Sequence, residues 1–458
     1  MSTGVRTDDE RVDDRGVDVL ARLDRIPVWA LPYRYLAIIG IGYFFTFYDI
    51  TDIGFAMPAI DEQFNLSGSE SLFVALAVGL VGYIVGSLVI GTLADSFGRY
   101  RMLILTITLT AIGSFGDAAA QGLTTLILFR FITGVGVGAD LNLVSTYLGE
   151  LAPARQRGRI AVYTFLVGIV GQAVTPFVAL ALVPTFDFGW RLLFVIGGVI
   201  AAMGLAVRFV LPESPRWEVL HGRDDAAEET VARMERNCRD KGIDLPEPEP
   251  SEVSLQRGVP LRFLLHQPYA GRLAVFMSMW FLWYIGNYGF LGDAASLIEE
   301  HGAAVGGSIL YLAIGSIGYP VGAALMIGLV DRVERRLLIL GATVVWLVGM
   351  LLIGSFASSA TIYVGAFLAS LALGSYLQVA YTFTAESFPT RARSTGFAFS
   401  DGIGHAGGAL GALVLPIVVG SFSFFVGFAA IGVTGLLAGL VALVGPAATG
   451  QRLERVSV

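Results

Sequence analysis

The sequence predicts an all-α membrane protein in which twelve transmembrane helices form two pseudo-symmetric six-helix bundles. The first observation is composition: 55% of the 458 residues are hydrophobic, 15% are charged and mean hydropathy is +0.71. A soluble globular domain is less hydrophobic and more highly charged. The second is a series of twelve apolar runs, each near the roughly 20 residues that a helix needs to cross a bilayer. The third is a pair of charged motifs that returns after about half the chain.

The expected spans follow one another with one long interruption, between the sixth and the seventh. They lie at about 33–57, 72–94, 102–120, 123–147, 160–182, 191–211, 271–297, 303–330, 337–357, 360–385, 394–420 and 422–445. They divide the chain into an N-terminal tail (1–32), an N-terminal bundle (33–211), a linker (212–270), a C-terminal bundle (271–445) and a C-terminal tail (446–458). Within the linker, Asp224–Arg239 is expected to form a surface helix and Leu245–Pro250 a stiff extended segment.

The loops predict the orientation of the chain in the membrane. Arginines stand in alternate loops, as at Arg99 and Arg101, whereas the loops near 58–71, 118–122 and 183–189 contain neither lysine nor arginine. Because basic loops are retained in the cytoplasm, both termini and the linker are expected to be cytoplasmic. The first apolar run has the length of a full span, so it is not a cleavable signal peptide.

Two charged motifs each occur twice. The first, at 91–101 (GTLADSFGRYR), returns at 328–336 (GLVDRVERR), and the second, at 150–159 (ELAPARQRGR), returns at 386–393 (ESFPTRAR). The two offsets, measured between the first residues, are 237 and 236 residues. Nearly equal offsets indicate two homologous halves, the plan of a large class of transporters that hold their substrate between the halves.

These motifs resemble the loop signatures of the major facilitator superfamily of transporters. Arg130–Gly138 (RFITGVGVG) is similar to the superfamily's signature for the fourth span, and Pro212–Trp217 (PESPRW) resembles the sugar-porter and metabolite:proton symporter branches. Tyr381–Arg393 resembles the metabolite:proton branch more closely. The resemblance covers nearly the whole chain and implies the major facilitator fold and secondary transport.

Differences from the related branches narrow the range of candidate substrates and transport directions. Residues 280–288 of the seventh span lack the paired glutamines of sugar porters, and the tenth span lacks their Pro-x-x-Trp. Both differences argue against a hexose as substrate. Gly168–Gln172 lacks the Gly-Pro pair common in drug antiporters, which argues against efflux. His405 stands where relatives often carry an arginine.

Ionisable residues at membrane depth are costly and therefore mark candidate functional sites. Asp49 and Arg130 lie seven to eight residues from the outer ends of their spans, which places both roughly 10–12 Å below the surface. The resemblance to sugar porters implies that they form the proton-coupling pair; the alternative is a permanent structural ion pair. Asp52, on the same helix face, shares the proton or faces the outer cavity. Asp140, in a segment that resembles phosphate:proton symporters, is a second coupling candidate or bonds a neighbouring hydroxyl.

Candidate substrate contacts lie in the fifth, seventh, tenth and eleventh spans. Asp401 and His405 are four residues apart on one helix face, a spacing that suits substrate contact or pH sensing. The other candidates are Gln172, Trp280, Trp283, Tyr284, Asn287, Gln378 and Tyr381. Each single aromatic could equally face lipid, whereas an amide in hydrocarbon needs a partner. Asp117 and Asp293 lie at span ends and are expected to be solvated.

The repeated charged motifs define an expected inner gate that closes the cytoplasmic side. By analogy with the superfamily, its members are Asp95, Arg99, Glu150, Arg157, Asp331, Arg332, Glu386 and Arg393. Their charge pairs would hold the two halves together while the substrate path faces outward.

The leading hypothesis is a proton-coupled symporter that takes up a small polar, anionic organic metabolite by alternating access. The alternatives are a sugar or phosphate proton symporter, an uncoupled facilitator, or a metabolite sensor that signals through the linker. No nucleotide loop or nucleophile–base set indicates an enzyme, and the single cysteine, Cys238, excludes a disulfide framework and a cysteine-based metal site. The expected partners are a small-molecule substrate, the proton as coupling ion and the lipid of the plasma or inner membrane, with no cofactor, metal or nucleic acid. The chain is expected to act as a monomer.

Overall fold

The computed structural model describes residues 14–67, 73–249, 260–301, 305–451 and 456. All regular secondary structure among these residues is helical. The elements are α1 (Asp14–Asp24), α2 (Tyr33–Phe64), η1 (Phe73–Val78), α4 (Gly79–Phe97), α5 (Arg99–Ala119), α6 (Leu123–Leu151), α7 (Arg157–Leu182), α8 (Gly189–Arg208), α9 (Pro215–Leu220), α10 (Asp224–Asp240), α11 (Pro260–Leu264), α12 (Tyr269–Glu300), α13 (Val305–Ser316), α14 (Gly318–Leu329), α15 (Arg335–Ser355), α16 (Ser359–Glu386), η2 (Thr390–Ala392), α17 (Arg393–Ser421) and α18 (Phe424–Ala442).

Within the described residues, eleven helices are long and apolar enough to cross a membrane. The remaining expected span, at about 271–297, falls inside the 32-residue helix α12. The expected span at about 72–94 is split into the π-helical η1 and α4, and that at about 303–330 into α13 and α14, which meet at Ile317. The helix α2 extends to Phe64, beyond the expected end near residue 57.

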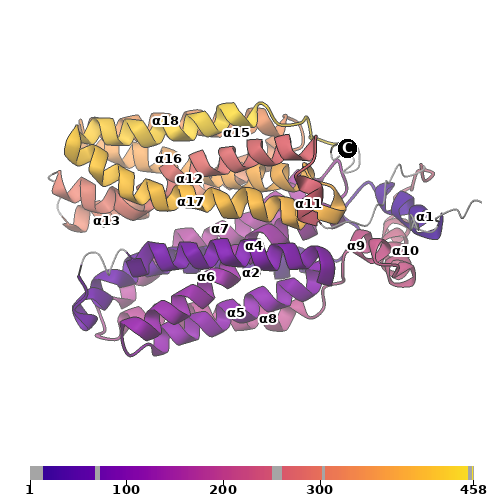
Figure 1. Ribbon diagram of the computed structural model, residues 1–458, viewed down its shortest axis with the longest axis horizontal. Helices are drawn as coiled ribbons and strands as arrows, with labels where there is room; N and C mark the ends of the chain where they lie inside the picture. Colours follow the sequence, from indigo (N-terminus) through magenta and orange to yellow (C-terminus); the bar gives the residue numbers. More distant parts are fainter. Residues whose placement is uncertain (1–13, 68–72, 250–259, 302–304, 452–455, 457–458) are drawn as a thin grey trace, which may run out of the picture.

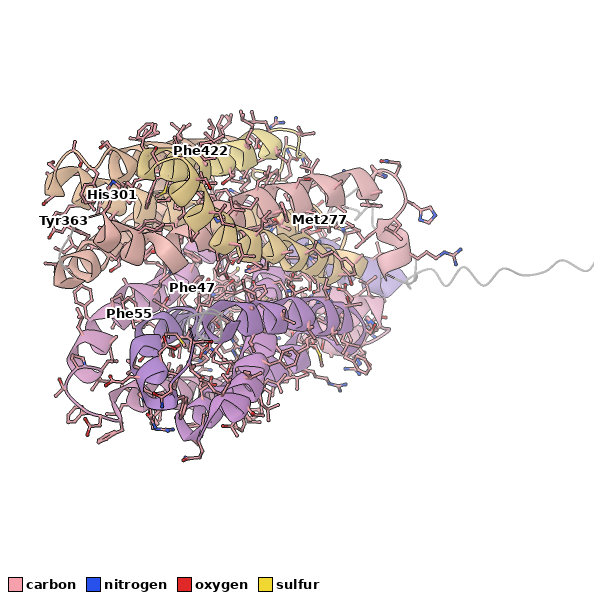
Figure 2. The ribbon with its side chains drawn as sticks, turned by 60° about the vertical axis from the view of Figure 1, so that its left-hand side comes forward. Phe47, Phe55, Met277, His301, Tyr363 and Phe422 are labelled. Atoms are coloured by element: carbon pink, nitrogen blue, oxygen red, sulfur yellow. The ribbon has the colours of Figure 1, made fainter. Side chains whose placement is uncertain are left out.

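The helices lie in two groups, which Figure 1 shows as a lower, indigo-to-magenta layer and an upper, orange-to-yellow layer. The N-terminal group holds η1, α2 and α4 to α8, and the C-terminal group holds α12 to α18. The groups meet mainly where α4 packs on α17 and α7 on α14. Figure 2 labels Phe47 of α2, whose ring packs on Phe165 of α7 within the N-terminal group.

Small residues let helices approach closely within each group. In α4, a Cβ atom on Gly86 would overlap the carbonyl oxygen of Val135 in α6, and one on Gly82 would lie 2.5 Å from that of Phe131. Glycines four residues apart are the usual device for such close helix contact in membranes.

The short helices α1, α9, α10 and α11 lie together at one end of the molecule, which we call the linker end (Figure 1). The predicted surface helix, Asp224–Arg239, is present as α10. Cys238 on this helix is fully buried. Arg22 of α1 and Arg25, directly after that helix, donate to Glu235 of α10 at 2.8 and 2.5 Å. Burial opposes the charged form of Glu235, but these two guanidinium groups prevail and lower its pKa. The N-terminal segment is therefore attached to the linker.

Candidate functional site

Four buried charged residues meet near the end opposite the linker end. The Nη1 atom of Arg130 on α6 lies 3.6 Å from Asp49 and 3.9 Å from Asp52, both on α2, and 3.5 Å from Asp117 on α5. We call these four residues the acidic cluster. Ser114 also donates to Asp49 at 3.1 Å. The structure thus brings together the pair expected from sequence, Asp49 and Arg130, with Asp52 beside them.

The expectation that Asp117 is solvated is wrong. Its side chain is fully buried. An apolar cluster that includes Met57, Leu126, Trp190 and Phe194 lies between Asp117 and the end of the N-terminal helix group. Asp117 therefore belongs to the acidic cluster although it lies in the last turn of its helix. The side chain of Asp293, the other acid expected at a span end, lies outside the described residues.

Asp140 lies in a separate buried site nearer the linker end. Its oxygens accept hydrogen bonds from Arg208 Nη1 at 2.6 Å and Nη2 at 3.1 Å, and from the hydroxyls of Thr46 at 3.2 Å and Thr106 at 2.9 Å. Sequence reasoning missed Arg208, which ends α8; the signal was an arginine next to an apolar run. A bidentate guanidinium and two hydroxyls saturate the carboxylate, an arrangement that suits a structural ion pair.

Asp401 joins the two helix groups near the middle of the molecule. Its carboxylate accepts hydrogen bonds from Tyr83 of α4 at 2.7 Å and from Tyr284 of α12 at 2.6 Å. The ring of His405 stacks on Tyr83 with a centroid distance of 3.6 Å and packs at a tilt on Tyr284 with a centroid distance of 3.8 Å. Tyr83 carries no charge and resembles any aromatic in a span, so its role could not be found from sequence.

Further aromatic side chains line up beside this site. Trp280 stacks on Tyr284 and Tyr381, with centroid distances of 5.3 and 5.0 Å, and donates to the Thr384 hydroxyl at 3.0 Å. Trp283 instead stacks on Tyr376 at 3.7 Å and packs on Trp346, both in the C-terminal group. Gln378 donates to Thr382 at 3.1 Å, and Gln172 and Asn287 are buried.

Two glutamates tie the groups together at the linker end. Glu150 of α6 accepts from Arg99 of its own group at 3.0 Å and from Arg393 of the other group at 2.9 Å. Glu386 of α16 is its counterpart: Arg335 of its own group lies at 3.1 Å and Arg157 of the other group at 3.2 Å.

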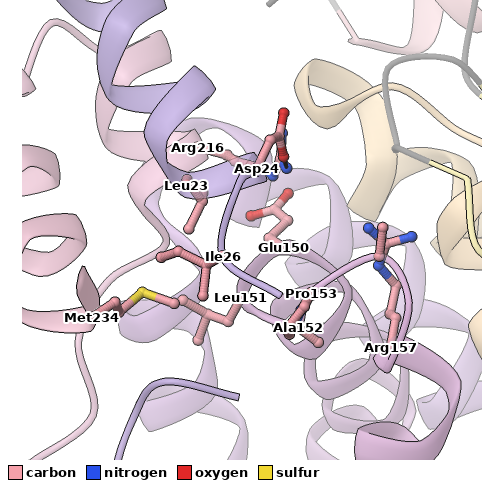
Figure 3. A pocket seen from close by; sticks show the side chains of 11 residues that line it. Leu23, Asp24, Ile26, Glu150, Leu151, Ala152, Pro153, Arg157, Arg216 and Met234 are labelled. Carbon is pink, nitrogen blue, oxygen red and sulfur yellow. Dashed lines mark hydrogen bonds and ion pairs between the residues drawn. The ribbon is translucent and has the colours of Figure 1, made fainter. Parts of the chain in front are cut away.

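Two aspartates of the repeated motif complete this closure. Asp95 accepts from the hydroxyl of Thr395 at 2.7 Å, and Asp331 accepts from the backbone N–H groups of Gly158 and Arg159, both at 3.0 Å. Each contact crosses between the groups. Arg332, which was expected in the gate, is exposed in the turn before α15, and the ion pair with Glu386 is made by Arg335, the first residue of α15. Figure 3 shows a small pocket beside this network, where Asp24 of α1 pairs with Arg216 of α9 next to Glu150.

Apolar spans in two groups, closed at one end by charge pairs and containing buried acids, define a membrane transport protein rather than an enzyme. The chain belongs to the sugar (and other) transporter family, whose model matches residues 35–458, and so to the major facilitator superfamily. It is 29% identical to the niacin transporter NiaP of Acinetobacter baylyi, over 88% of this chain and 90% of that protein. It is 27% identical to the 4-hydroxybenzoate transporter PcaK of the same species, over 81% and 82%.

A solved structure has the same fold. The proton:xylose symporter XylE, bound to 6-bromo-6-deoxy-D-glucose, superposes with a TM-score of 0.76 at 20% identity, covering 96% of this chain and 99% of that one.

Proposed function

We propose that this chain is a proton-coupled symporter that takes up a small organic carboxylate by alternating access. The observation that carries the proposal is the acidic cluster. One guanidinium and three carboxylates sum to a charge of −2 when all are ionised. A permanent structural pair needs one acid for one base, so two of the three carboxylates exceed what Arg130 neutralises.

The excess acid explains how protons drive the cycle. Uncompensated charge in a water-excluded site is costly, and the cost falls when carboxylates bind protons. Proton binding would therefore weaken the ion pair between Arg130 and Asp49 and permit the two helix groups to move relative to each other. Proton release would restore the ion pair. Asp49 and Arg130 are the proposed coupling pair, with Asp52 and Asp117 as neighbours that raise the demand for protons.

The proposed orientation places the linker end in the cytoplasm. Arginine-rich loops, the tail arginines Arg22 and Arg25, and both glutamate-centred charge networks lie at that end. We propose twelve spans, with α12 as the seventh and α13 with α14 as the eighth, in two bundles at about 33–211 and 271–445. The chain would act as a monomer in the plasma or inner membrane.

The proposed substrate class is an aromatic or heteroaromatic acid. Two relatives at 27–29% identity are named for niacin and for 4-hydroxybenzoate, both flat rings with a carboxylate. The stack of Trp280, Tyr284 and Tyr381 offers flat aromatic faces beside polar hydroxyls, which suits such a ring. The proton:xylose symporter shares only the fold at 20% identity, and a sugar is the second candidate.

Uptake into proteoliposomes tests this proposal. Radiolabelled nicotinate, 4-hydroxybenzoate, D-xylose and phosphate are supplied outside, with and without an inward proton gradient. We expect one of the two aromatic acids to accumulate above its outside concentration only with the gradient. Equilibration without accumulation would indicate a facilitator, and accumulation of xylose or phosphate alone would contradict the substrate class.

A further inference from the structure

One of the contacts between the two helix groups is a line along α4 and α17 that runs from the linker end to mid-molecule. On α4 it runs through Asp95, Gly91, Ser87 and Tyr83, and on α17 through Thr395, Ala398, Asp401 and Gly402. The four residues of α4 are spaced by four and so share one helix face. Opening of the linker end must separate this line, and its innermost contacts are the bond between Tyr83 and Asp401 and the stacking of Tyr83 on the ring of His405.

Within the part of the chain that the structure describes, no arginine or lysine forms an ion pair with the buried Asp401 carboxylate. Among the described residues, its basic neighbour is His405, whose Nδ1 lies 3.8 Å from the carboxylate and 2.9 Å from the Asp401 backbone carbonyl. That shorter contact makes Nδ1 a donor to the backbone. The carboxylate is instead stabilised by two tyrosine hydroxyls, one from each helix group.

The protonation state of Asp401 controls the bond between the groups. An ionised carboxylate accepts from both tyrosines, and hydrogen bonds of 2.6–2.7 Å to a carboxylate are about twice as strong as neutral ones. A protonated carboxyl is neutral and carries the proton on one oxygen. The bonds to both tyrosines lose their charge-assisted strength, and the tyrosine that faces the protonated oxygen must turn its own proton elsewhere. Proton binding therefore weakens the link between Tyr83 and Asp401.

We propose that Asp401 is a second proton-binding site, separate from the acidic cluster, whose protonation releases Tyr83 and permits the linker end to open. The titratable groups facing it are Tyr83 of α4, Tyr284 and Tyr288 of α12, Tyr376 and Tyr381 of α16, Tyr43 of α2 and His405 of its own helix. None of these described neighbours belongs to the acidic cluster. The inference deepens the proposed symport and depends on it for its role in transport.

Infrared difference spectroscopy tests the proton site without a substrate. Purified full-length protein is titrated from alkaline to acid pH, and the absorption of protonated buried carboxyls is recorded. We expect Asp401→Asn to lose one component that Asp49→Asn retains, and Asp401→Glu to keep that component at a shifted frequency. Wild-type and Asp401→Asn spectra that coincide throughout the titration would overturn the proposal, as would an unshifted Asp401→Glu spectrum.

Spin-label distances test the release of the linker end. Labels are attached through Arg101→Cys and Leu337→Cys, both exposed and in different groups, in a Cys238→Ala background. Acid should lengthen the wild-type distance; Asp401→Asn should lengthen it at all pH values, and His405→Gln should retain the acid response. An acid response in Asp401→Asn equal to that of wild type would contradict the mechanism. Gradient-independent uptake by the wild type would defeat the proposed symport, whereas an unchanged Asp401→Asn spectrum would defeat only this inference.

Discussion

Glu150 and Arg393 belong to different helix groups, yet their side chains lie 2.9 Å apart and both are fully shielded from solvent. Glu386 and Arg157 repeat the relationship at 3.2 Å with the groups exchanged. Each glutamate also pairs with an arginine of its own group, Arg99 or Arg335. This twofold arrangement locks the linker end in the observed closed state.

Loss of the charge of Glu150 or Glu386 should favour opening of the linker end. Glu150→Gln weakens charge-assisted hydrogen bonds to Arg99 and Arg393, each worth about 1.5–3 kcal/mol. We expect the ratio of open to closed molecules to rise about tenfold or more, measured as the spin-label distance between Arg101→Cys and Leu337→Cys. Glu386→Gln should act in the same direction because the two sites are equivalent. An unchanged distance distribution in both variants would show that the ion pairs of Glu150 and Glu386 do not hold the linker end closed.

Asp140 should behave as a structural partner of Arg208. Asp140→Asn leaves the Arg208 guanidinium buried with incomplete compensation, and we expect a loss of roughly 3–5 kcal/mol of stability, seen as a lower Tm in detergent. Replacement of both residues, as Asp140→Leu with Arg208→Met, should recover most of that loss. If the double variant folds but no longer couples uptake to the proton gradient, Asp140 has the coupling role that the sequence also allowed.

The contact between α4 and α6 should tolerate no added atom. Gly86→Ala would place a Cβ atom onto the Val135 carbonyl oxygen, so we expect a loss of about 1–3 kcal/mol from overpacking. Gly341→Ala is the matched control, because a Cβ atom there meets nothing within 4 Å. The control should leave the Tm unchanged or raise it slightly, since alanine favours a helix by about 1 kcal/mol over glycine. Equal effects at both positions would contradict the packing argument.

Glu218 of α9 should make stability depend on pH. Burial raises the pKa of its carboxyl from 4.5 to about 7, with a further contribution from Glu213. Between these pH values the folded state binds more protons than the unfolded state, so stability falls as pH rises through this window. Glu218→Gln should remove this slope and raise the Tm at pH 8 relative to wild type, with little effect at pH 4. A parallel Tm profile for the variant would contradict the assignment.

Much of the fold could be predicted from the sequence because a bilayer imposes span length and loop charge directly. The pairing of Asp49 and Arg130 was predicted from their similar depth, their opposite charges and the resemblance to sugar porters. The error at Asp117 arose because position along one helix says nothing about the apolar side chains that other helices place over its end.

The remaining site residues depend on neighbours that sequence spacing does not define. Arg208 meets Asp140 only because α8 packs against α5 and α2, and Tyr83 meets Asp401 only because α4 packs against α17 of the other group. In the repeated gate motif, three arginines were available near Asp331. Arg335 begins α15 and reaches Glu386, whereas Arg332 lies in the turn before that helix and is exposed.

The most direct test of proton coupling compares two kinds of 4-hydroxybenzoate flux in proteoliposomes containing Asp49→Asn. Accumulation driven by a proton gradient requires a titratable group opposite Arg130, whereas counterflow of labelled for unlabelled substrate does not. Asp187→Asn, an exposed loop acid, is the matched control and should retain both fluxes. We predict that Asp49→Asn loses gradient-driven accumulation and retains counterflow. Accumulation at the wild-type level in Asp49→Asn would contradict the coupling role of the acidic cluster.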